Sequence, residues 1–232
     1  MLTLIQYPAA FGSSSASPFC TKVEILLKMS GLDYTTEDLS DARKMPHAKL
    51  PVLRDGHKLI PDSVCIRRHL ESKHGVDFDR VLGKKDLALS HAFTRLCEER
   101  LYWVMLYSRW MDDANWEIIK QHFFAEIPWP GRVIVPGIVR KQVRQALKAQ
   151  GVGSHSPDKI YSFGIEDLES ISTFLGDKAF LMGDEVSSVD ATVYALLEGI
   201  LMAPFPSPLK AAAEKMSGFS GYCERMHDRF LK

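Results

Sequence analysis

The chain has 232 residues, of which 46% are hydrophobic and 25% are charged, and its 29 Lys and Arg residues balance its 29 Asp and Glu residues. This composition is typical of a globular protein that is long enough to bury one large hydrophobic core or two smaller ones. A net charge of zero argues against a nucleic-acid-binding protein, and the lack of any run of about 18 apolar residues argues against a membrane-spanning helix.

The N-terminal part of the chain alternates between predicted strands and predicted helices. Four short runs predict strands, namely residues 2–7, 33–39, 49–54 and 58–60. Between the last two runs stand Asp55 and Gly56, a dipeptide typical of a two-residue hairpin turn. Helices are predicted at residues 18–30 and 64–73.

The helix at residues 18–30 has both of its ends defined by the sequence. Ser17 can cap the first free backbone N–H groups, Pro18 fits the first helical position, and Gly31 suits the left-handed turn after the last residue. Ser17 and Cys20 therefore lie where a small-residue loop gives way to a helix. The free N–H groups and the helix dipole stabilise an anion at that point, and a thiolate is such an anion.

After this alternating region, no further strand is expected. Apolar positions recur at helical intervals, and the predicted helical segments are residues 84–112, 114–126, 137–150, 158–175, 188–202 and 208–230. A polar stretch at residues 77–85 separates the two patterns. The sequence therefore predicts an α+β domain at residues 1–77 and an all-helical domain at residues 85–232.

Several motifs, in this order along the chain, resemble those of the glutathione transferase superfamily. They are Ser17-Pro18-Phe19-Cys20, Leu50-Pro51-Val52, Asp62-Ser63, Phe180-Leu-Met-Gly183 and Ser187-Ser-Val-Asp190. The segments Val76–Asp79, Leu101–Trp103 and Tyr107–Trp110 are most similar to the failed-axon-connections and metaxin-related branch. The resemblance implies an α+β thioredoxin-like N-terminal domain followed by an all-α C-terminal domain.

The resemblance also implies that glutathione binds in the N-terminal domain as a thiolate, with Ser17 as the catalytic residue. A hydroxyl that donates a hydrogen bond to a thiol lowers the pKa of that thiol, and so does a helix N-terminus. In tau-class transferases the Ser of a similar turn has this role. The competing interpretation is that Ser17 only caps its helix, which also explains the residue type.

Cys20 is a second candidate on the same helical turn. Its position near the helix N-terminus favours a thiolate, which can form a mixed disulfide with glutathione. A dithiol cycle is not expected, because Ser17 stands where glutaredoxins carry their first cysteine. The competing interpretation is a small buried side chain under the helix. Phe19, between the two, belongs to the glutathione-binding set that the resemblance implies.

Two further segments belong to that set. If the Leu50–Pro51 peptide bond is cis, the N–H and C=O of Leu50 face the cysteinyl backbone of glutathione. Ser63 can cap the following helix, and Asp62 can accept a hydrogen bond from the α-ammonium of the γ-glutamyl group. Lys49 can attract a glutathione carboxylate. Capping without a ligand and a solvated lysine are the competing interpretations.

Three aromatic side chains in the helical part are candidates for a substrate pocket. Trp103, Tyr107 and Trp110 recur at spacings of four and three, so they share one helix face. They belong either to the protein core or to an apolar pocket for a hydrophobic electrophile between the two domains, with Arg109 near its rim.

Ser187 and Asp190 fit a capping box in which Asp replaces the usual Glu, and we assign them to folding and not to chemistry. The four cysteines lie far apart and show no zinc-ligand spacing, so we expect free thiols in a reducing compartment and no bound metal. The first residues lack the basic segment and long apolar core of a signal peptide, which favours a cytoplasmic protein.

The leading prediction is a glutathione S-transferase that conjugates glutathione to a hydrophobic electrophile, with rate gained from thiolate formation and proximity. One alternative is a glutathione-dependent thiol reductase that uses Cys20. Another is a non-catalytic, metaxin-like interaction module. A homodimer is expected because the superfamily usually forms one.

Overall fold

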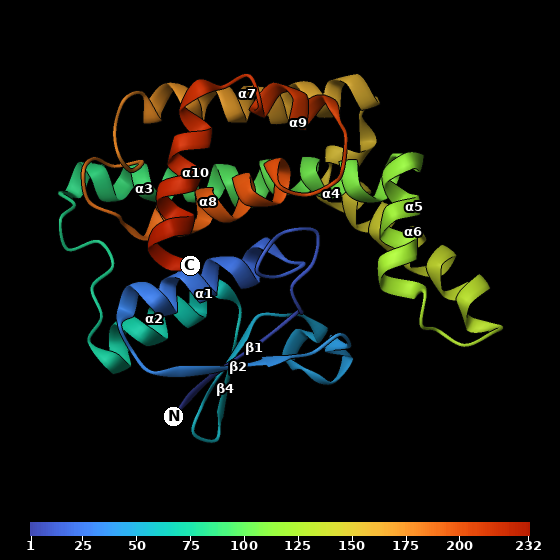
Figure 1. The fold of residues 1–232 in the computed structure, drawn as a ribbon, viewed down its shortest axis with the longest axis horizontal. Coiled ribbons are helices and arrows are strands. Elements are labelled where there is room, and N and C mark those ends of the chain that lie inside the picture. The colour runs from blue at the N-terminus through green and yellow to red at the C-terminus, as the bar shows by residue number, and fades with distance from the viewer.

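The computed structural model describes residues 1–232, and its N-terminal part is a four-stranded mixed sheet with two helices (Figure 1). The strands are β1 (Leu2–Gln6), β2 (Tyr34–Asp38), β3 (Val52–Asp55) and β4 (Lys58–Pro61), in the spatial order β2-β1-β3-β4. Strand β1 pairs parallel with β2 and antiparallel with β3, which forms the predicted hairpin with β4. The thioredoxin-like topology expected from the sequence is confirmed.

The two helices of this part begin and end close to the predicted residues. They are α1 (Pro18–Ser30) and α2 (Ser63–His74). The C-cap of α1 is Gly31, which has a φ of 67°, and the C-cap of α2 is Gly75, which has a φ of 69°. Both glycines adopt the left-handed conformation that stops a helix with little steric cost.

The rest of the chain is helical, as expected. Its helices are α3 (Lys84–Leu96), α4 (Tyr102–Met111), α5 (Asp113–Phe124), α6 (Gly131–Gln150), α7 (Pro157–Leu175), α8 (Ser188–Leu201), α9 (Pro208–Ala213) and α10 (Ser217–Phe230). A π-helical turn, Cys97–Leu101, joins α3 to α4 within the predicted 84–112 segment. None of these helices combines the length and the apolar character needed to cross a lipid bilayer.

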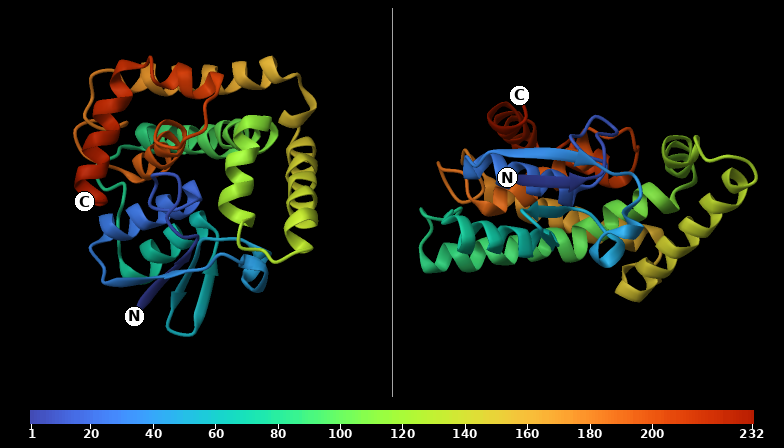
Figure 2. Two further views of the ribbon diagram at one scale, coloured as in Figure 1. Left: turned by 45° about the vertical axis from the view of Figure 1, so that its right-hand side comes forward. Right: turned by 90° about the horizontal axis from the view of Figure 1, so that it is seen from below.

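Helix α6 begins well before the segment predicted for it. The sequence places its start at residue 137, because Pro136 and Gly137 are poor residues for a helix interior. The structure starts α6 at Gly131 and includes Pro136 as a buried residue. Helices α5 and α6 lie side by side at one end of the helical domain, beyond α4 (Figures 1 and 2).

One main hydrophobic core runs through both parts of the chain. It includes Leu26 of α1 and Ile66 of α2 together with Leu168 of α7 and Leu197 of α8. Helix α8 is buried along its whole length from Ser188 to Ile200 and packs against α1. The two parts therefore share a core, and burying it favours one fixed arrangement of the sheet and the helical domain.

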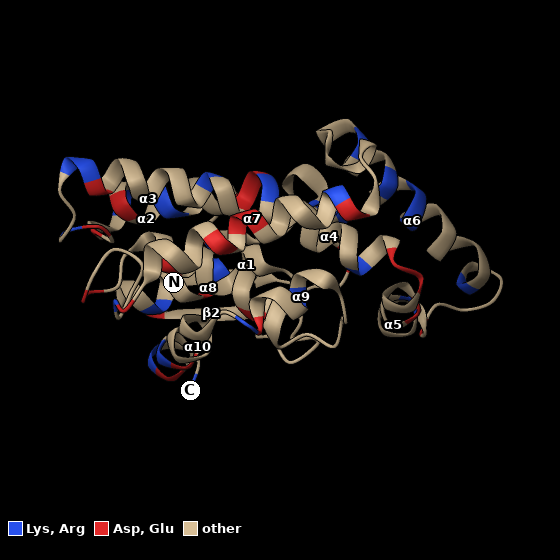
Figure 3. Ribbon diagram, turned by 90° about the horizontal axis from the view of Figure 1, so that it is seen from above, with Lys and Arg blue, Asp and Glu red and all other residues tan.

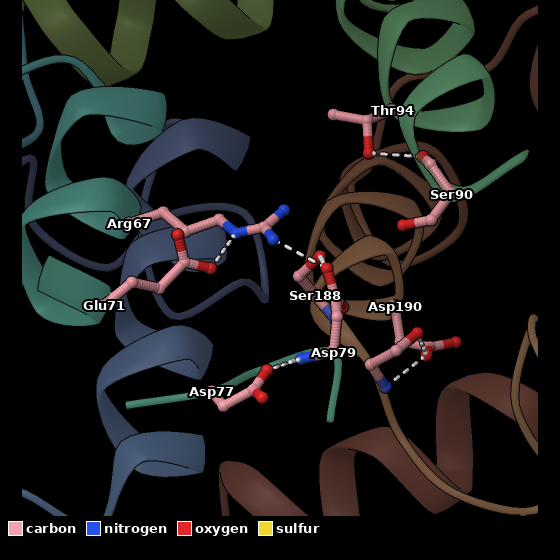
Figure 4. Close-up of polar contacts among 9 residues, drawn as sticks. Arg67, Glu71, Asp77, Asp79, Ser90, Thr94, Ser188 and Asp190 are labelled. Atoms are coloured by element: carbon pink, nitrogen blue, oxygen red, sulfur yellow. Dashed lines mark hydrogen bonds and ion pairs between the residues drawn. The ribbon is translucent and has the colours of Figure 1, made fainter. Parts of the chain in front are cut away.

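Polar contacts reinforce this arrangement at the boundary. Lys22 of α1 and Glu98 of the π-helical turn form a buried ion pair with an Nζ–Oε1 distance of 2.6 Å. Asp79 accepts hydrogen bonds from Arg67 of α2 at 2.6 Å and from the backbone N–H of Ser188 at 2.9 Å (Figure 4). The connection between the two parts is thus tied to the first residue of α8.

Candidate functional site

A cavity of about 740 Å³ lies between the N-terminal domain and the helices α4, α5 and α6. From the N-terminal domain it is lined by the end of β1, the start of α1 and the turn after β2, with Tyr7, Ser17 and Asp41 among the lining residues. Its helical wall includes Tyr102, Met105, Leu106, Arg109 and Trp110 of α4, together with Ile119, His122, Phe123 and Phe124 of α5. A mostly apolar cavity between two domains is a common place for a ligand.

Ser17 lies at the edge of this cavity and occupies the N-cap position of α1. Its backbone is extended (φ −114°, ψ 124°), and its C=O accepts hydrogen bonds from the N–H groups of Cys20 (3.0 Å) and Thr21 (3.1 Å). Its hydroxyl makes no capping hydrogen bond. The local backbone therefore shapes the helix start without using the Ser17 side chain, which lines the cavity.

Hydrogen bonds from both domains fix the loop that precedes Ser17. The Ser15 hydroxyl donates to the C=O of Tyr7 at 2.8 Å and accepts from the N–H of Ser17 at 3.3 Å. Arg109 of α4 donates to the C=O of Ala16 at 3.3 Å. The position of Ser17 thus depends on a side chain of the helical domain as well as on its own loop.

Cys20 lies one turn further on, and its side chain is 0% exposed. It belongs to a small apolar cluster whose other members are Ile5, Ala42, Leu50 and Val52. Burial raises the pKa of the Cys20 thiol to about 11, although hydrogen bonds from the Tyr7 backbone and from the Ser15 and Ser17 side chains oppose the rise. Of the two interpretations that the sequence allows, the structure favours a small buried side chain under the helix, because desolvation outweighs the effect of the helix N-terminus on the pKa of the thiol.

The segment at residues 49–51 meets the first turn of α1 through this cluster. The Leu50–Pro51 peptide bond is cis, as predicted. Leu50 and Pro51 are buried, and Leu50 packs in the same cluster as Cys20, whereas Lys49 is exposed. None of these three residues lines the 740 Å³ cavity.

The acidic-Ser pair at the start of α2 differs from its predicted roles. Asp62, and not Ser63, is the N-cap, and its Oδ1 accepts hydrogen bonds from the N–H groups of Val64 (2.8 Å) and Cys65 (3.3 Å). Ser63 is buried as the first helical residue. Asp62 is exposed and has a φ of 72°, a conformation that costs a non-glycine residue about 1–3 kcal/mol and that often marks a functional position. Neither residue lines the cavity.

Only one of the three predicted pocket aromatics lines the cavity. Trp110 does so and packs against Trp116, with 5.6 Å between ring centroids. Trp103 packs instead beside Tyr102, and Tyr107 packs against Tyr161 of α7. Trp103 and Tyr107 pack against the protein core, the other position that the sequence allows, because α4 turns a neighbouring face toward the cavity. The residues of that face are Tyr102, Met105, Leu106, Arg109 and Trp110.

Phe19 also has a different place from the predicted one. Its ring meets the ring of Tyr102 edge-on, with 4.8 Å between centroids. The contact joins the first turn of α1 to α4, so the observed role of Phe19 is to pack the two domains together beside the cavity.

Arg109 is buried, whereas the sequence suggested a position near the rim. Its guanidinium donates to the C=O of Gly199 at 2.7 Å in addition to Ala16, and lies 5.1 Å from the centroid of the Phe205 ring. Burial lowers its pKa to about 10, so the group remains a cation at neutral pH, and no carboxylate forms an ion pair with it. A buried positive charge, on which the charge of Glu198 also acts, therefore lies directly behind the Ser17 loop.

The sequence did not predict that two tyrosines, Tyr7 and Tyr102, line the cavity. Tyr7 follows β1, and Tyr102 starts α4. Burial raises the pKa of both phenols, so both are neutral hydrogen-bond donors at neutral pH. The available signal was the helical spacing of Tyr102, Leu106 and Arg109, which marks the face beside the predicted aromatic one.

The mixed sheet, the cis-proline segment beside α1 and the all-helical second part define a thioredoxin-like domain joined to an all-α domain. Residues 18–115 match the family model of the glutathione S-transferase N-terminal domain, and residues 164–226 match that of the C-terminal domain. The chain is 37% identical over 212 residues to isoprene-epoxide–glutathione S-transferase of Rhodococcus sp. (strain AD45), with 88% of each chain covered. The chain belongs to the glutathione S-transferase family.

Two further relatives are not named as transferases. Failed axon connections of Drosophila melanogaster is 30% identical over 234 residues, which cover 93% of this chain and 54% of that protein. Metaxin-1 of Macaca fascicularis is 29% identical over 207 residues, covering 84% of this chain and 64% of that protein. The chain thus spans between half and two thirds of the length of these two relatives.

Two solved structures show the same fold at low sequence identity. The beta-etherase LigF of Sphingobium sp. strain SYK-6 superposes with a TM-score of 0.64 at 16% identity, covering 97% of this chain and 94% of that one. A glutathione S-transferase of Ceriporiopsis subvermispora, solved in complex with glutathione, has a TM-score of 0.63 at 18% identity, with 98% and 96% covered.

Proposed function

We propose that this protein is a glutathione S-transferase that holds glutathione as a thiolate beside Ser17 and conjugates it to a hydrophobic electrophile in the 740 Å³ cavity. One observation carries the proposal. The Ser17 hydroxyl stands at the N-cap position of α1, makes no capping hydrogen bond there, and lines the cavity. A hydroxyl that caps no backbone group, at the positive end of a helix, suits an anionic sulfur.

Three features would lower the pKa of the bound thiol. The Ser17 hydroxyl would donate a hydrogen bond to the sulfur, and the N-terminus of α1 would favour its negative charge. The Arg109 guanidinium, which donates a hydrogen bond to the C=O of Ala16, adds positive charge next to that turn. Cys20 has no part in this step, because its buried thiol is protonated at neutral pH.

The rest of glutathione would follow the N-terminal domain. We assign the backbone of Leu50 to the cysteinyl part and the exposed Asp62 carboxylate to the α-ammonium of the γ-glutamyl part, with Lys49 near a glutathione carboxylate. In support, the buried side chains of Leu50 and Cys20 pack together, so the Leu50 segment lies beside the turn that carries Ser17. Only one oxygen of Asp62 accepts from the helix N–H groups, which leaves the other for a ligand.

The electrophile we propose is a small epoxide with an apolar body. The relative at 37% identity is named for an isoprene epoxide, and the cavity combines apolar walls with the two neutral phenols of Tyr7 and Tyr102. The glutathione sulfur would attack one ring carbon, so that an S–C bond forms as the C–O bond breaks. One of the phenols would donate its proton to the resulting alkoxide, and the product would be a hydroxy thioether.

Binding of glutathione tests the proposal directly. Millimolar glutathione should raise the melting temperature, because a ligand that binds only the native state stabilises it. Asp62→Asn is the matched variant: Asn also caps helices and tolerates a positive φ, but it removes the charge that would pair with the ammonium group. We expect Asp62→Asn to keep the melting temperature of the free protein and to bind glutathione at least about tenfold more weakly. An unshifted melting temperature of the parent protein with glutathione would rule out the transferase.

A specific surface favours one second candidate, a protein-interaction module. Trp129 is 82% exposed just before α6, and Val133, Ile134 and Ile138 of α6 are exposed as well. The charged residues of α6 are all Lys or Arg, as the blue bands without red in Figure 3 show. A module of this kind, as Failed axon connections and the metaxins suggest, would keep this surface and show no glutathione-dependent stabilisation.

We further propose a cytoplasmic homodimer, which the resemblance to the superfamily implies. All four cysteines are free thiols, which is in keeping with a reducing compartment. Sedimentation equilibrium of the purified chain would test the dimer, and a single species of monomer mass at micromolar concentration would contradict it.

A further inference from the structure

Three side chains with metal-ligating atoms converge at the end of α2 that lies opposite to Asp62. Oδ2 of Asp55, at the end of β3, is 2.8 Å from Nε2 of His69 and 2.9 Å from Nε2 of His74. The ligand atoms of all three residues lie within 4.8 Å of one another. None of the three lines the cavity, and the proposed conjugation does not use them.

The fold itself brings these side chains together. Asp55 ends β3 immediately before the Gly56–His57 turn that leads into β4, and α2 packs against this hairpin. His69 and His74 lie in the last part of α2, with 5.7 Å between their ring centroids and 68° between their ring planes. The side chains of His69, Asp55 and His74 are 12%, 21% and 23% exposed, so the cluster is held by its surroundings and remains open to solvent.

We propose that Asp55, His69 and His74 bind a divalent transition-metal ion of the Zn²⁺ type. Two imidazole nitrogens and one carboxylate oxygen are a ligand set that zinc and its neighbours prefer. Zinc ligands at about 2.0–2.2 Å from the metal lie roughly 3.3 Å apart in a tetrahedral site, so the Asp55–His contacts need to open by only about half an ångström.

The electrostatics of the cluster also favour a cation. Oδ2 of Asp55 lies 2.8 and 2.9 Å from Nε2 of the two histidines, so a cation bound among the three would contact a carboxylate oxygen. The carboxylate supplies negative charge, and the negative end of the α2 dipole adds to it at His74. Metal binding requires each Nε2 to be unprotonated, which the neutral imidazole achieves by carrying its proton on Nδ1.

Three protein ligands leave one position for water, so the ion would exchange with solvent. The bound ion would tie the β3–β4 hairpin to the C-terminal turn of α2 and stabilise the N-terminal domain. This inference does not rest on glutathione binding, because the cluster lies at the other end of α2 from Asp62.

Zinc binding to the full chain tests the proposal, measured by equilibrium dialysis and by the shift in melting temperature. All proteins would carry Cys65→Ser, because Cys65 is an exposed thiol, and glutathione would be absent because its thiol binds zinc. The variants are His69→Gln and His74→Gln, and the matched control is His57→Gln, an exposed histidine in the same hairpin.

We expect one zinc ion per chain, at least about tenfold weaker binding in each ligand variant, and unchanged binding in the control. Cobalt(II) bound at the same site should give visible absorption of a tetrahedral complex, which the ligand variants lose. If His69→Gln impairs folding, His74→Gln, whose side chain is the more exposed, still decides the outcome. Absence of stoichiometric zinc in the parent protein, or equal affinity in the parent and in His74→Gln, would overturn the proposal.

Discussion

The helices α1 and α8 both have a serine at the N-cap position, and the surroundings of these two serines differ. At the start of α8 the buried Asp190 carboxylate accepts two hydrogen bonds from Ser187, one from its N–H (2.9 Å) and one from its hydroxyl (3.0 Å). The same carboxylate accepts two more, from the N–H of Leu181 (2.7 Å) and from the hydroxyl of Tyr222 (3.1 Å). At the start of α1 the Ser17 hydroxyl has no capping partner and lines a cavity. The same sequence signal thus marks a stabilising cap in one place and an available donor in the other.

The largest effect should come from breaking the α8 cap. Asp190→Ala removes the acceptor of four buried hydrogen bonds and leaves their donors without partners, so we expect a loss of about 3–5 kcal/mol in the free energy of unfolding. Asp190→Asn, which keeps one acceptor oxygen, should lose less. Urea denaturation measures both, and a loss below about 1 kcal/mol in Asp190→Ala would show that the network is dispensable.

Glu198 lies near the C-terminal end of α8, the helix that packs against α1. The pKa of the Glu198 carboxyl is raised to about 7, mainly by burial. A hydrogen bond from Tyr194 lowers this pKa, and the negative charge of Glu24 raises it further. Because this pKa lies above the ordinary value of 4.5, the group contributes stability that is fully present below about pH 4.5 and is lost as the pH rises through 7.

Glu198→Gln removes this titration and keeps the shape of the side chain. Between about pH 5 and pH 8 the free energy of unfolding of the parent should fall relative to the variant by on the order of 1–3 kcal/mol. Denaturant titrations of both proteins across this range measure the difference. Parallel pH profiles would mean that Glu198 does not take up a proton on folding in this range.

Ser17 should show the opposite behaviour to Asp190. Ser17→Ala should change the free energy of unfolding by less than about 0.5 kcal/mol, because its hydroxyl caps nothing. Conjugation of glutathione to a model aryl halide should fall by about 10- to 100-fold at neutral pH and recover partly one to two pH units higher, since the bound thiol loses a charge-assisted hydrogen bond. A rate–pH profile that overlays the parent at every pH would exclude Ser17 as the thiolate-stabilising group.

The smallest effect is expected at Cys20. Cys20→Ala should leave conjugation within about twofold of the parent, because a buried, protonated thiol is not the nucleophile, and should cost on the order of 1 kcal/mol of stability through the small space it leaves. Mass spectrometry of the parent with oxidised glutathione should show no adduct at this residue. An adduct at Cys20, lost in Cys20→Ala together with disulfide reduction, would favour the thiol reductase instead.

The elements that follow from short-range rules were predicted well. Ser17 and Pro18 mark the start of α1 and Gly31 marks its end, as the structure confirms. The Asp55-Gly56 dipeptide correctly predicted the β3–β4 hairpin, although the two turn residues are Gly56 and His57. Such signals depend only on backbone geometry within a few residues. The start of α6 was predicted too late, because packing that buries Pro136 outweighs the local preference against proline inside a helix.

The sequence by itself determined the class of the fold, the position of the first helix turn and the residue types available there, because periodicity and end signals are local properties of the chain. The tertiary structure alone decided which groups are buried. It turned Tyr102 and Arg109 toward the cavity and Tyr107 toward α7, and it enclosed Cys20 so that its thiol stays protonated. Desolvation and facing direction arise from segments far apart in the chain, and no local pattern encodes them.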